Sequence, residues 1–538
     1  MKPSRLTTRD LDIIDAPAGT RSFRAAWRWW LAPALLALIL ALIFLDPFIG
    51  DWDGLDYTVL SLAGRPSSMI LGRMLFIFTN HALWLVAHAF FNLSPDQAYL
   101  LFKFAVVAQS PLAVMAWWVL ARELTDSVRA ATLAVLLLSV SPFFILYSGQ
   151  VMTEIPSLLW MAVGLIIHLR GVRGRRIPMV LIGAALLGLS VNIREAGLLY
   201  APWLLIAPLV CGWRLERREI LTTALACLVF LLFALGLFGA WFWLDVEGYR
   251  GAWYGWVEST RLESARHPVS LANFGTLLRY FLYAAPLALP LFPFASISEY
   301  RQRGLTLLLA FGCLGFFANL SLIIHYSVVL NGRYLLTGLP AMLPLVAVHL
   351  LRVLTGLTGQ TRRAFASSLL LISLVSIGTG LRWWPGSLAY ARARALTKDY
   401  RTQLALLPPD AVVIPGGQTV AVTYWRGIGA GHWDVIGTGG GWPGGHLAPD
   451  IERYLKEGRR VFLDADPRWW AVCGWQEAET RELAATQMRF NFRRVSGTIF
   501  ELRPLADAAA RDEPNLETLL PEQRPADVQK CGGQGKLS

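Results

Sequence analysis

Four carboxylates gather within eleven residues directly after the first apolar segment, at Asp46, Asp51, Asp53 and Asp56. Clustered carboxylates repel one another unless they share a cation or a proton. Such a cluster suits either a divalent metal ion or a general base whose pKa is raised by like charge. A solvated loop with aspartate caps and a glycine turn is the alternative explanation for this segment.

A further carboxylate, Glu154, follows Thr153 at the predicted start of a later apolar helix. Thr153 suits the N-cap position and Pro156 is tolerated in the first turn, so Glu154 could simply complement the helix dipole. Counting the predicted membrane crossings places Glu154 on the same side of the membrane as the aspartates. Two acidic sites at one interface favour a shared active site.

Cationic residues are expected at the same interface, at Arg194 after one apolar run and at Arg333-Tyr334 before another. An arginine at a membrane boundary often only snorkels to the surface. Positive charge is otherwise sparse on this side of the predicted membrane, and a guanidinium binds phosphate bidentately without losing its proton. Carboxylates together with arginines at one face therefore predict group transfer from a lipid phosphate.

The elements that must position these residues are apolar helices. Of the 538 residues, 55% are apolar and 16% are charged, and several apolar runs reach the length that crosses a bilayer. This composition excludes a soluble enzyme, a disordered chain and a fibrous protein. The net charge of +12 lies largely in short loops, as the positive-inside rule predicts, so it does not indicate nucleic-acid binding.

The hydropathy pattern predicts an all-α polytopic membrane domain over residues 29–384 with about 11 transmembrane helices. Residues 1–28 form a cytoplasmic segment because arginines precede the first span. Residues 46–97 form the first external loop. Its apolar stretch Met69–Phe91 begins and ends on the same side, which indicates an interfacial or re-entrant element.

Beyond residue 385 the composition changes toward that of a soluble domain. Short alternating runs at 411–414, 419–423 and 460–464 predict strands, and the intervening stretches predict helices. Residues 385–505 are therefore expected to form a small external α/β domain. The polar, proline-containing tail 506–538 is expected to be disordered.

Several motifs resemble those of the GT-C superfamily of membrane glycosyltransferases. The order of segments is similar too, with a short cytoplasmic N-terminus, one span and then a long first loop that opens with acidic residues. The acidic loop motif of its mannosyltransferase-like members is similar to Trp52-Asp53-Gly-Leu-Asp56-Tyr57 with Leu62-Ala63-Gly64-Arg65 after it. Two further resemblances are Met152-Thr153-Glu154-Ile155-Pro156, at a helix start, and Asn331-Gly-Arg333-Tyr334-Leu-Leu with Pro340. Many relatives carry adjacent acidic residues in the first loop, whereas this chain has spaced aspartates.

The resemblance implies an inverting transfer of one sugar, a hexosyl group, from a polyprenyl-phosphate donor to an acceptor hydroxyl. Asp53 is then the expected general base, which takes the hydroxyl proton as the oxygen attacks the anomeric carbon. Asp51, Asp56 and Glu154 would orient either a divalent metal such as Mg²⁺ or Mn²⁺ or the acceptor. Arg333 with Tyr334, and Arg194, would hold the leaving phosphate.

No nucleotide cofactor is expected, and the acceptor is a lipid, a glycan or a protein. The expected location is the inner membrane of a bacterial cell, with the C-terminal domain in the periplasm. A polymerase or ligase of lipid-linked glycans is the closer alternative, since the charged segment Asp245–Thr276 resembles a late external loop that could carry its key residues. A transporter or flippase of lipid-linked sugars is the other alternative, although no internal repeat is found.

Overall fold

The computed structural model describes residues 23–45, 52–214, 216–266, 271–325, 332–383, 400–437, 446–466, 483 and 489–505. Asp46 and Asp51 of the acidic cluster lie outside the described residues, as does the tail 506–538.

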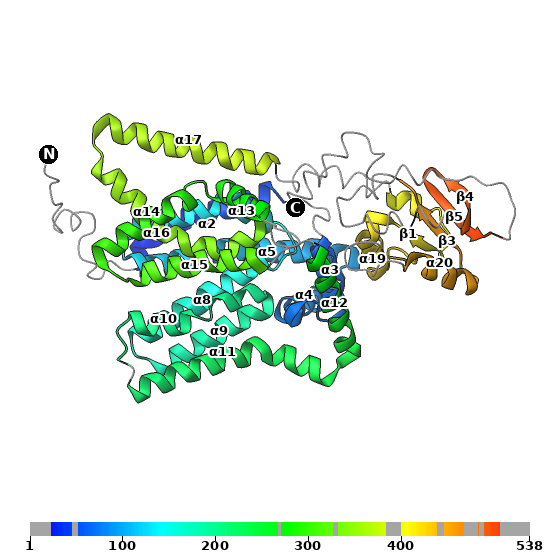
Figure 1. Cartoon of the computed structure of the whole chain (residues 1–538), viewed down its shortest axis with the longest axis horizontal. Helices are drawn as coiled ribbons and strands as arrows, with labels where there is room; N and C mark the ends of the chain where they lie inside the picture. The colour runs from blue at the N-terminus through cyan, green and yellow to red at the C-terminus, as the bar shows by residue number, and fades with distance from the viewer. Residues whose placement is uncertain are drawn as a thin grey trace.

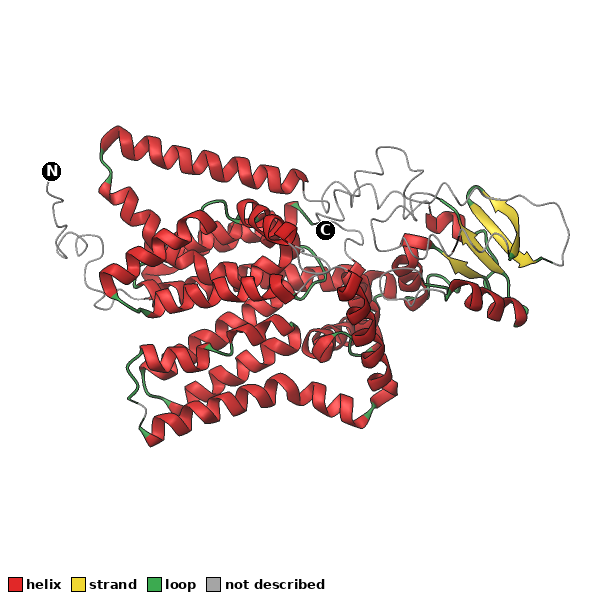
Figure 2. Cartoon of the chain, viewed as in Figure 1, coloured by secondary structure: helices red, strands yellow, loops and turns green. Residues whose placement is uncertain are grey.

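Helices fill the first three quarters of the chain (Figures 1 and 2). The first half of them comprises α2 (Phe23–Ile43), α3 (Trp52–Ala63), η1 (Ile70–Arg73), α4 (Met74–Phe91), α5 (Pro95–Thr125), α6 (Val128–Ser139), α7 (Pro142–Ser148), α8 (Glu154–Arg173), α9 (Ile177–Ile193) and η2 (Glu195–Tyr200). The second half comprises α10 (Trp203–Val210), α11 (Arg217–Leu244), η3 (Val246–Gly248), α12 (Tyr249–Arg266), α13 (Leu271–Ala284), α14 (Ala288–Arg303), α15 (Leu307–His325), η4 (Gly332–Tyr334), α16 (Leu335–Gly356) and α17 (Gly359–Trp383).

Helices suited to cross a membrane can be counted in the described part of the chain by their length and composition. Within the described residues, five are long and apolar enough, and the number reaches seven if two bent helix pairs, α6 with α7 and α13 with α14, each form one span. Further apolar helices such as α9 and α10 are shorter than a usual span. The protein is a multi-pass helical membrane protein, but a count of 11 spans is not confirmed.

Glycines bring neighbouring helices of this bundle into close contact. A Cβ atom on Gly183 of α9 would lie 2.4 Å from the backbone nitrogen of His168 in α8, and one on Gly338 of α16 would lie 2.0 Å from the carbonyl oxygen of Gly315 in α15. Small residues allow such approach, which supplies the van der Waals contact that holds helices together in lipid. The bundle is therefore tightly packed around α8, α9, α15 and α16.

Helices α3, α4 and α12 gather at the end of the bundle that is nearer to the C-terminal sheet (Figure 1). By length and composition, Leu71–Phe91 could cross a membrane. In Figure 1, however, α4 lies across this end of the bundle and does not run beside the long helices α8 and α11. An interfacial position for this segment stays a prediction.

The C-terminal domain is a small α/β unit, with a five-stranded sheet in the order β2-β1-β3-β5-β4. Strand β1 is parallel to β2 and β3, and β5 is antiparallel to β3 and β4. The described elements are β1 (Val412–Ile414), η5 (Gly416–Gln418), α19 (Thr419–Gly427), β2 (Asp434–Val435), α20 (Leu447–Lys456), β3 (Val461–Asp464), β4 (Phe490–Ser496) and β5 (Ile499–Pro504).

Two of the three predicted strands are present, as β1 and β3. The strand predicted at 419–423 is wrong, because these residues begin α19. Its valines and threonines suggest a strand locally. Over the full segment, however, Ala421, Val422, Trp425 and Ile428 are buried, which is a helical spacing.

Helix α19 also attaches the C-terminal domain to the helical bundle. Gly427 packs against Val59 of α3 so closely that a Cβ atom would lie 2.8 Å from a methyl group of the valine. Nearby, the ring of Tyr424 meets that of Tyr99 in α5 edge to face, with 6.3 Å between the ring centres. The C-terminal domain is thus packed on α3, the helix that begins with the acidic cluster.

Candidate active site

Two of the predicted carboxylates lie on the first turns of α3. Asp53 is in the first turn, where a negative charge complements the helix dipole, and Asp56 follows one turn later on the same side. Gly54 lets the helix start lie against its neighbours, because a Cβ atom there would be 3.3 Å from the Val151 carbonyl oxygen and 3.4 Å from the Tyr99 hydroxyl. This contact fixes Asp53 close to the start of α8.

Glu154 opens α8 and is almost fully buried, with its side chain 2% exposed. Thr153 occupies the N-cap position as expected, but its side chain makes no capping hydrogen bond. The Glu154 carboxylate instead forms an ion pair with Arg194 at 2.6 Å and lies 3.7 Å from the guanidinium group of Arg333. Its role therefore extends beyond complementing the helix dipole.

Arg333 joins the two acidic elements. Its guanidinium lies 2.8 Å from Asp53 and 3.7 Å from Glu154, so it sits between α3 and α8. The guanidinium groups of Arg333 and Arg194 both lie 5.5 Å from the ring centre of Tyr334, within the range of a cation–π interaction. The structure thus brings together Asp53, Glu154, Arg194, Arg333 and Tyr334 from four separate segments.

The start of α16, which follows Arg333-Tyr334, is fixed by contacts from two other helical segments. The Gly338 backbone N–H donates to the side-chain oxygen of Asn319 in α15 at 3.0 Å. The Tyr200 hydroxyl of η2 donates to the Thr337 carbonyl at 2.7 Å. Because both contacts are buried, they hold the first turn of α16 and with it the direction of Arg333.

A third guanidinium, that of Arg73, belongs to the same cluster and was not predicted from the sequence. It lies 3.2 Å from Glu195 and 5.2 Å from the ring centre of Tyr57. The sequence signals were an arginine inside an apolar run and an acidic residue beside Arg194. Neither signal indicates that the two side chains meet, because 122 residues separate them.

The two aspartates of α3 differ in charge state. Burial raises the pKa of Asp53, but the guanidinium groups of Arg333, Arg73 and Arg194 outweigh burial and hold that pKa below its usual value. Burial and the charge of Asp53 raise the pKa of Asp56 to about 7, against the opposing effect of Arg73. The Asp56 side chain is exposed, so water offsets part of the burial effect. Asp53 is therefore the carboxylate that stays charged well below neutral pH.

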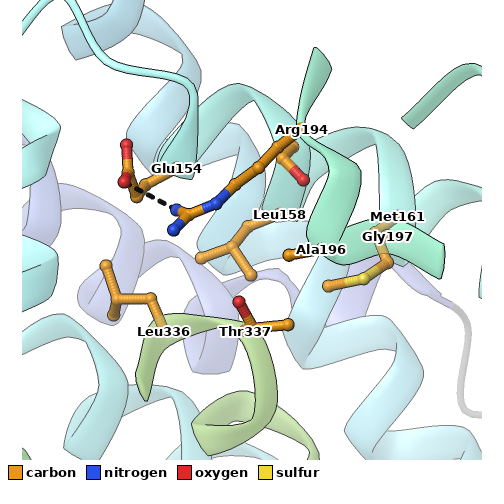
Figure 3. Close-up of a pocket in the computed structure, with 9 residues that line it drawn as sticks. Glu154, Leu158, Met161, Arg194, Ala196, Gly197, Leu336 and Thr337 are labelled. Atoms are coloured by element: carbon orange, nitrogen blue, oxygen red, sulfur yellow. Dashed lines mark ion pairs between the residues drawn. The ribbon is translucent and has the colours of Figure 1, made fainter. Parts of the chain in front are cut away.

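A narrow recess lies beside the Glu154–Arg194 ion pair (Figure 3). Leu158 and Met161 of α8 line it together with Leu336 and Thr337 at the start of α16. Its walls are mixed, because Ser157 and Thr337 add polar groups to the apolar side chains beside the ion pair. The recess has room for about one water molecule, so it is a small gap beside the buried ion pair.

The predicted metal site can be compared with the side chains that the structure places near one another. Within the described ranges, no group of three His, Cys, Asp or Glu side chains could hold a metal ion. Glu154 does not fit a metal ligand, because two guanidinium groups already surround its carboxylate. The other two predicted metal ligands are Asp51 and Asp56. Asp51 lies outside the described residues, so Asp56 is the remaining candidate ligand with a described position.

Comparison with known proteins places this site in a known fold. No protein-family model and no curated protein matches the sequence. Among solved structures, the chain has the fold of GT-C membrane glycosyltransferases, as the resemblance predicted. ArnT from Cupriavidus metallidurans bound to undecaprenyl phosphate aligns with a TM-score of 0.53 at 14% identity, over 90% of this chain and 100% of that chain. The archaeal oligosaccharyltransferase AglB from Archaeoglobus fulgidus, in complex with an inhibitory peptide and a dolichol-phosphate, aligns with a TM-score of 0.52 at 15% identity, over 93% and 78%.

Proposed function

We propose that this protein is an integral membrane glycosyltransferase that transfers a hexosyl group from a polyprenyl-phosphate donor to an acceptor hydroxyl. The observation that carries this proposal is the cluster of Asp53, Glu154, Arg194 and Arg333, whose charged groups meet from four separate segments. A carboxylate that stays charged near neutral pH, next to phosphate-binding guanidinium groups, provides a base and a leaving-group site within one cluster.

In the proposed reaction Asp53 accepts the proton of the acceptor hydroxyl. The oxygen attacks the anomeric carbon, and the bond from that carbon to the phosphate oxygen breaks on the opposite face, so the configuration inverts. The electron pair of the broken bond leaves with the polyprenyl phosphate. Arg333 and Arg194 stabilise the charge that develops on this phosphate, and Tyr334 holds the two guanidinium groups in place.

The two structural neighbours support the donor class. One is bound to undecaprenyl phosphate and the other to a dolichol-phosphate, so both hold a polyprenyl chain that ends in phosphate. In this protein, the guanidinium groups of Arg194 and Arg333 would be suited to hold such a phosphate group. The proposed membrane is a bacterial inner membrane with the N-terminus in the cytoplasm. The proposed acceptor is a lipid, a glycan or a protein on the opposite, periplasmic face.

The metal requirement is a separate part of the proposal. With Glu154 engaged by arginines, the spaced aspartates Asp51 and Asp56 are the donors left for a divalent cation such as Mg²⁺ or Mn²⁺. Hard cations prefer such carboxylate oxygens and would also help to neutralise the leaving phosphate. Turnover measured in EDTA, with and without added Mg²⁺ or Mn²⁺, tests this requirement.

The experiment that tests the function uses the full chain purified in detergent. It is incubated with short-chain polyprenyl-phosphate sugars and candidate acceptors, and the release of polyprenyl phosphate is measured. Asp53→Asn should lower the rate by about 10²- to 10⁴-fold, the usual contribution of a general base. Asp96→Asn, at an exposed first-turn position of α5, is the matched control and should leave the rate unchanged. Equal rates in Asp53→Asn and the wild type would contradict the assignment of the base.

A polymerase or ligase of lipid-linked glycans is the second candidate, since one structural neighbour is an oligosaccharyltransferase. Its key residues were expected among the charges of residues 245–276. Several of these charges are used locally: Glu258 pairs with Arg261 on the exposed face of α12, and Glu247 pairs with Arg65. These contacts favour α12 as a surface helix over the site. Transfer of several sugars in place of one would support the second candidate.

A further inference from the structure

The turn that carries Arg73 has an unusual backbone. Leu71, Gly72 and Arg73 have φ values of 56°, 70° and 46°, so three consecutive residues are in the left-handed region. That region is unfavourable for leucine and arginine because Cβ crowds the following carbonyl oxygen. Strained backbone of this kind persists only where surrounding contacts enforce it, and such places often serve a function.

Contacts from α12 and from the turn itself enforce this conformation. The Ser67 N–H donates to the Gly72 carbonyl at 2.9 Å and closes the loop. The Tyr249 hydroxyl, from the first turn of α12, donates to the Ser67 carbonyl at 3.0 Å. It lies so close to Gly72 that a Cβ atom there would be 2.8 Å away. The start of α12 therefore fixes the turn and leaves room only for glycine.

The turn delivers the Arg73 guanidinium into the buried cluster. The side chain is 10% exposed and makes one ion pair, from a terminal nitrogen to Glu195 at 3.2 Å. Its Nε is buried without a hydrogen-bond partner, and so is the Nε of Arg194. Arg73 is also near enough to Asp53 and Asp56 to act on the charge of both carboxyls. Two buried guanidinium groups thus have unsatisfied donors in one cluster.

We propose that Arg73 is a further substrate-binding residue, which donates to the phosphate group of the lipid-linked donor alongside Arg194 and Arg333. A buried N–H without a partner is costly, and phosphate oxygens are the acceptors that guanidinium groups bind best. The strained turn and its support by Tyr249 place this donor in the cluster before a ligand arrives. This proposal rests on the function proposed above and adds a third cation to the phosphate site.

Binding measurements on the full chain in detergent test this role without turnover. Arg73→Met should weaken binding of short-chain polyprenyl phosphate by about 10- to 100-fold, the loss expected for a charge-assisted hydrogen bond. Arg65→Met is the matched control, because Arg65 lies in the same loop, is 62% exposed and pairs with Glu247. It should bind the lipid as the wild type does. Arg73→Lys should restore part of the affinity.

Inorganic phosphate is the second probe. It shows whether Arg73 binds a free phosphate group or only a phosphate group carried by a lipid. If Arg73→Met weakens binding of both probes, the contact is to the phosphate group itself. If it weakens binding of polyprenyl phosphate alone, the contact forms only with the membrane-borne ligand. Unchanged affinity for both probes in a folded Arg73→Met protein would overturn the proposal while leaving the proposed function intact. A wild type that binds neither probe would instead count against the function.

Glu195→Gln distinguishes a binding role from a purely structural one. If Arg73 served only to hold Glu195, then Arg73→Met and Glu195→Gln would lower the melting temperature alike, and neither would act on the ligand specifically. If Arg73 binds phosphate, removing its counter-charge in Glu195→Gln should leave lipid affinity equal or raise it. Weaker lipid binding in Glu195→Gln at an unchanged melting temperature would contradict the proposed contact.

Discussion

The charge states of Asp53 and Asp56 predict how the rate of sugar transfer depends on pH. The pKa of Asp53 is held below its usual value, so this carboxylate stays deprotonated as the pH falls from 8 to 6. The pKa of Asp56 is raised to about 7. A group with that pKa is about nine-tenths deprotonated at pH 8 and about one-tenth at pH 6, a difference of roughly tenfold. A base must be deprotonated to act, so the two candidates give different pH profiles.

If Asp53 is the base, the single-turnover rate of polyprenyl-phosphate release at saturating donor and acceptor should change by less than about twofold between pH 8 and pH 6. Single turnover is required because the released phosphate monoester itself titrates near pH 6 and could alter product dissociation. The donor is a phosphodiester, whose single charge does not change in this range. Asp56→Asn should keep the flat profile, whatever activity it loses as a proposed metal ligand.

A fall of about tenfold at pH 6 that disappears in Asp56→Asn would show that protonation of Asp56 controls the reaction and would refute this reasoning. A fall in Asp56→Asn as well would point to another titrating group.

Three further substitutions test the site and its supports. Arg333→Met should weaken polyprenyl-phosphate binding by about 10- to 100-fold, as measured by titration in detergent, because its guanidinium is a proposed phosphate ligand. Gly338→Val should lower the melting temperature sharply, since even a Cβ atom would lie 2.0 Å from the Gly315 carbonyl oxygen; an unchanged melting temperature would contradict this packing. Gly427→Leu should speed proteolytic release of the C-terminal domain, because the new side chain would clash with Val59, and equal proteolysis would argue against the contact.

Three of the site residues that the sequence indicated share one property, which is a position at or near the start of an apolar helix. Asp53 begins α3, Glu154 begins α8, and Arg333 directly precedes α16. The change from polar to apolar residues marks such positions, and counting membrane crossings predicts which of them face the same side. Their meeting could therefore be proposed before the structure, although the individual ion pairs could not.

Arg73 and the bent helix pairs show which features the sequence does not reveal. An arginine within an apolar run reads as an interfacial residue, because its left-handed backbone and its contact with Glu195 depend on segments far away in the chain. The hydropathy of a helix likewise does not reveal whether it bends at a proline or a loop, as the pair α13 and α14 does by 90°. Tertiary packing decides both outcomes, and neither leaves a local signal.

The ion pairs of the site suggest how donor binding would act on the proposed base. Arg333 is shared between Asp53 and Glu154, and Glu154 also holds Arg194, so the guanidinium groups are already neutralised by carboxylates. If Arg333 binds the donor phosphate as proposed, the phosphate would draw it away from Asp53, which its guanidinium now contacts. Asp53 would then lose part of its counter-charge and accept a proton more readily, while Arg73 and Arg194 still favour its charged form. The base would thus gain strength only once the sugar donor is in place, which limits side reactions in its absence.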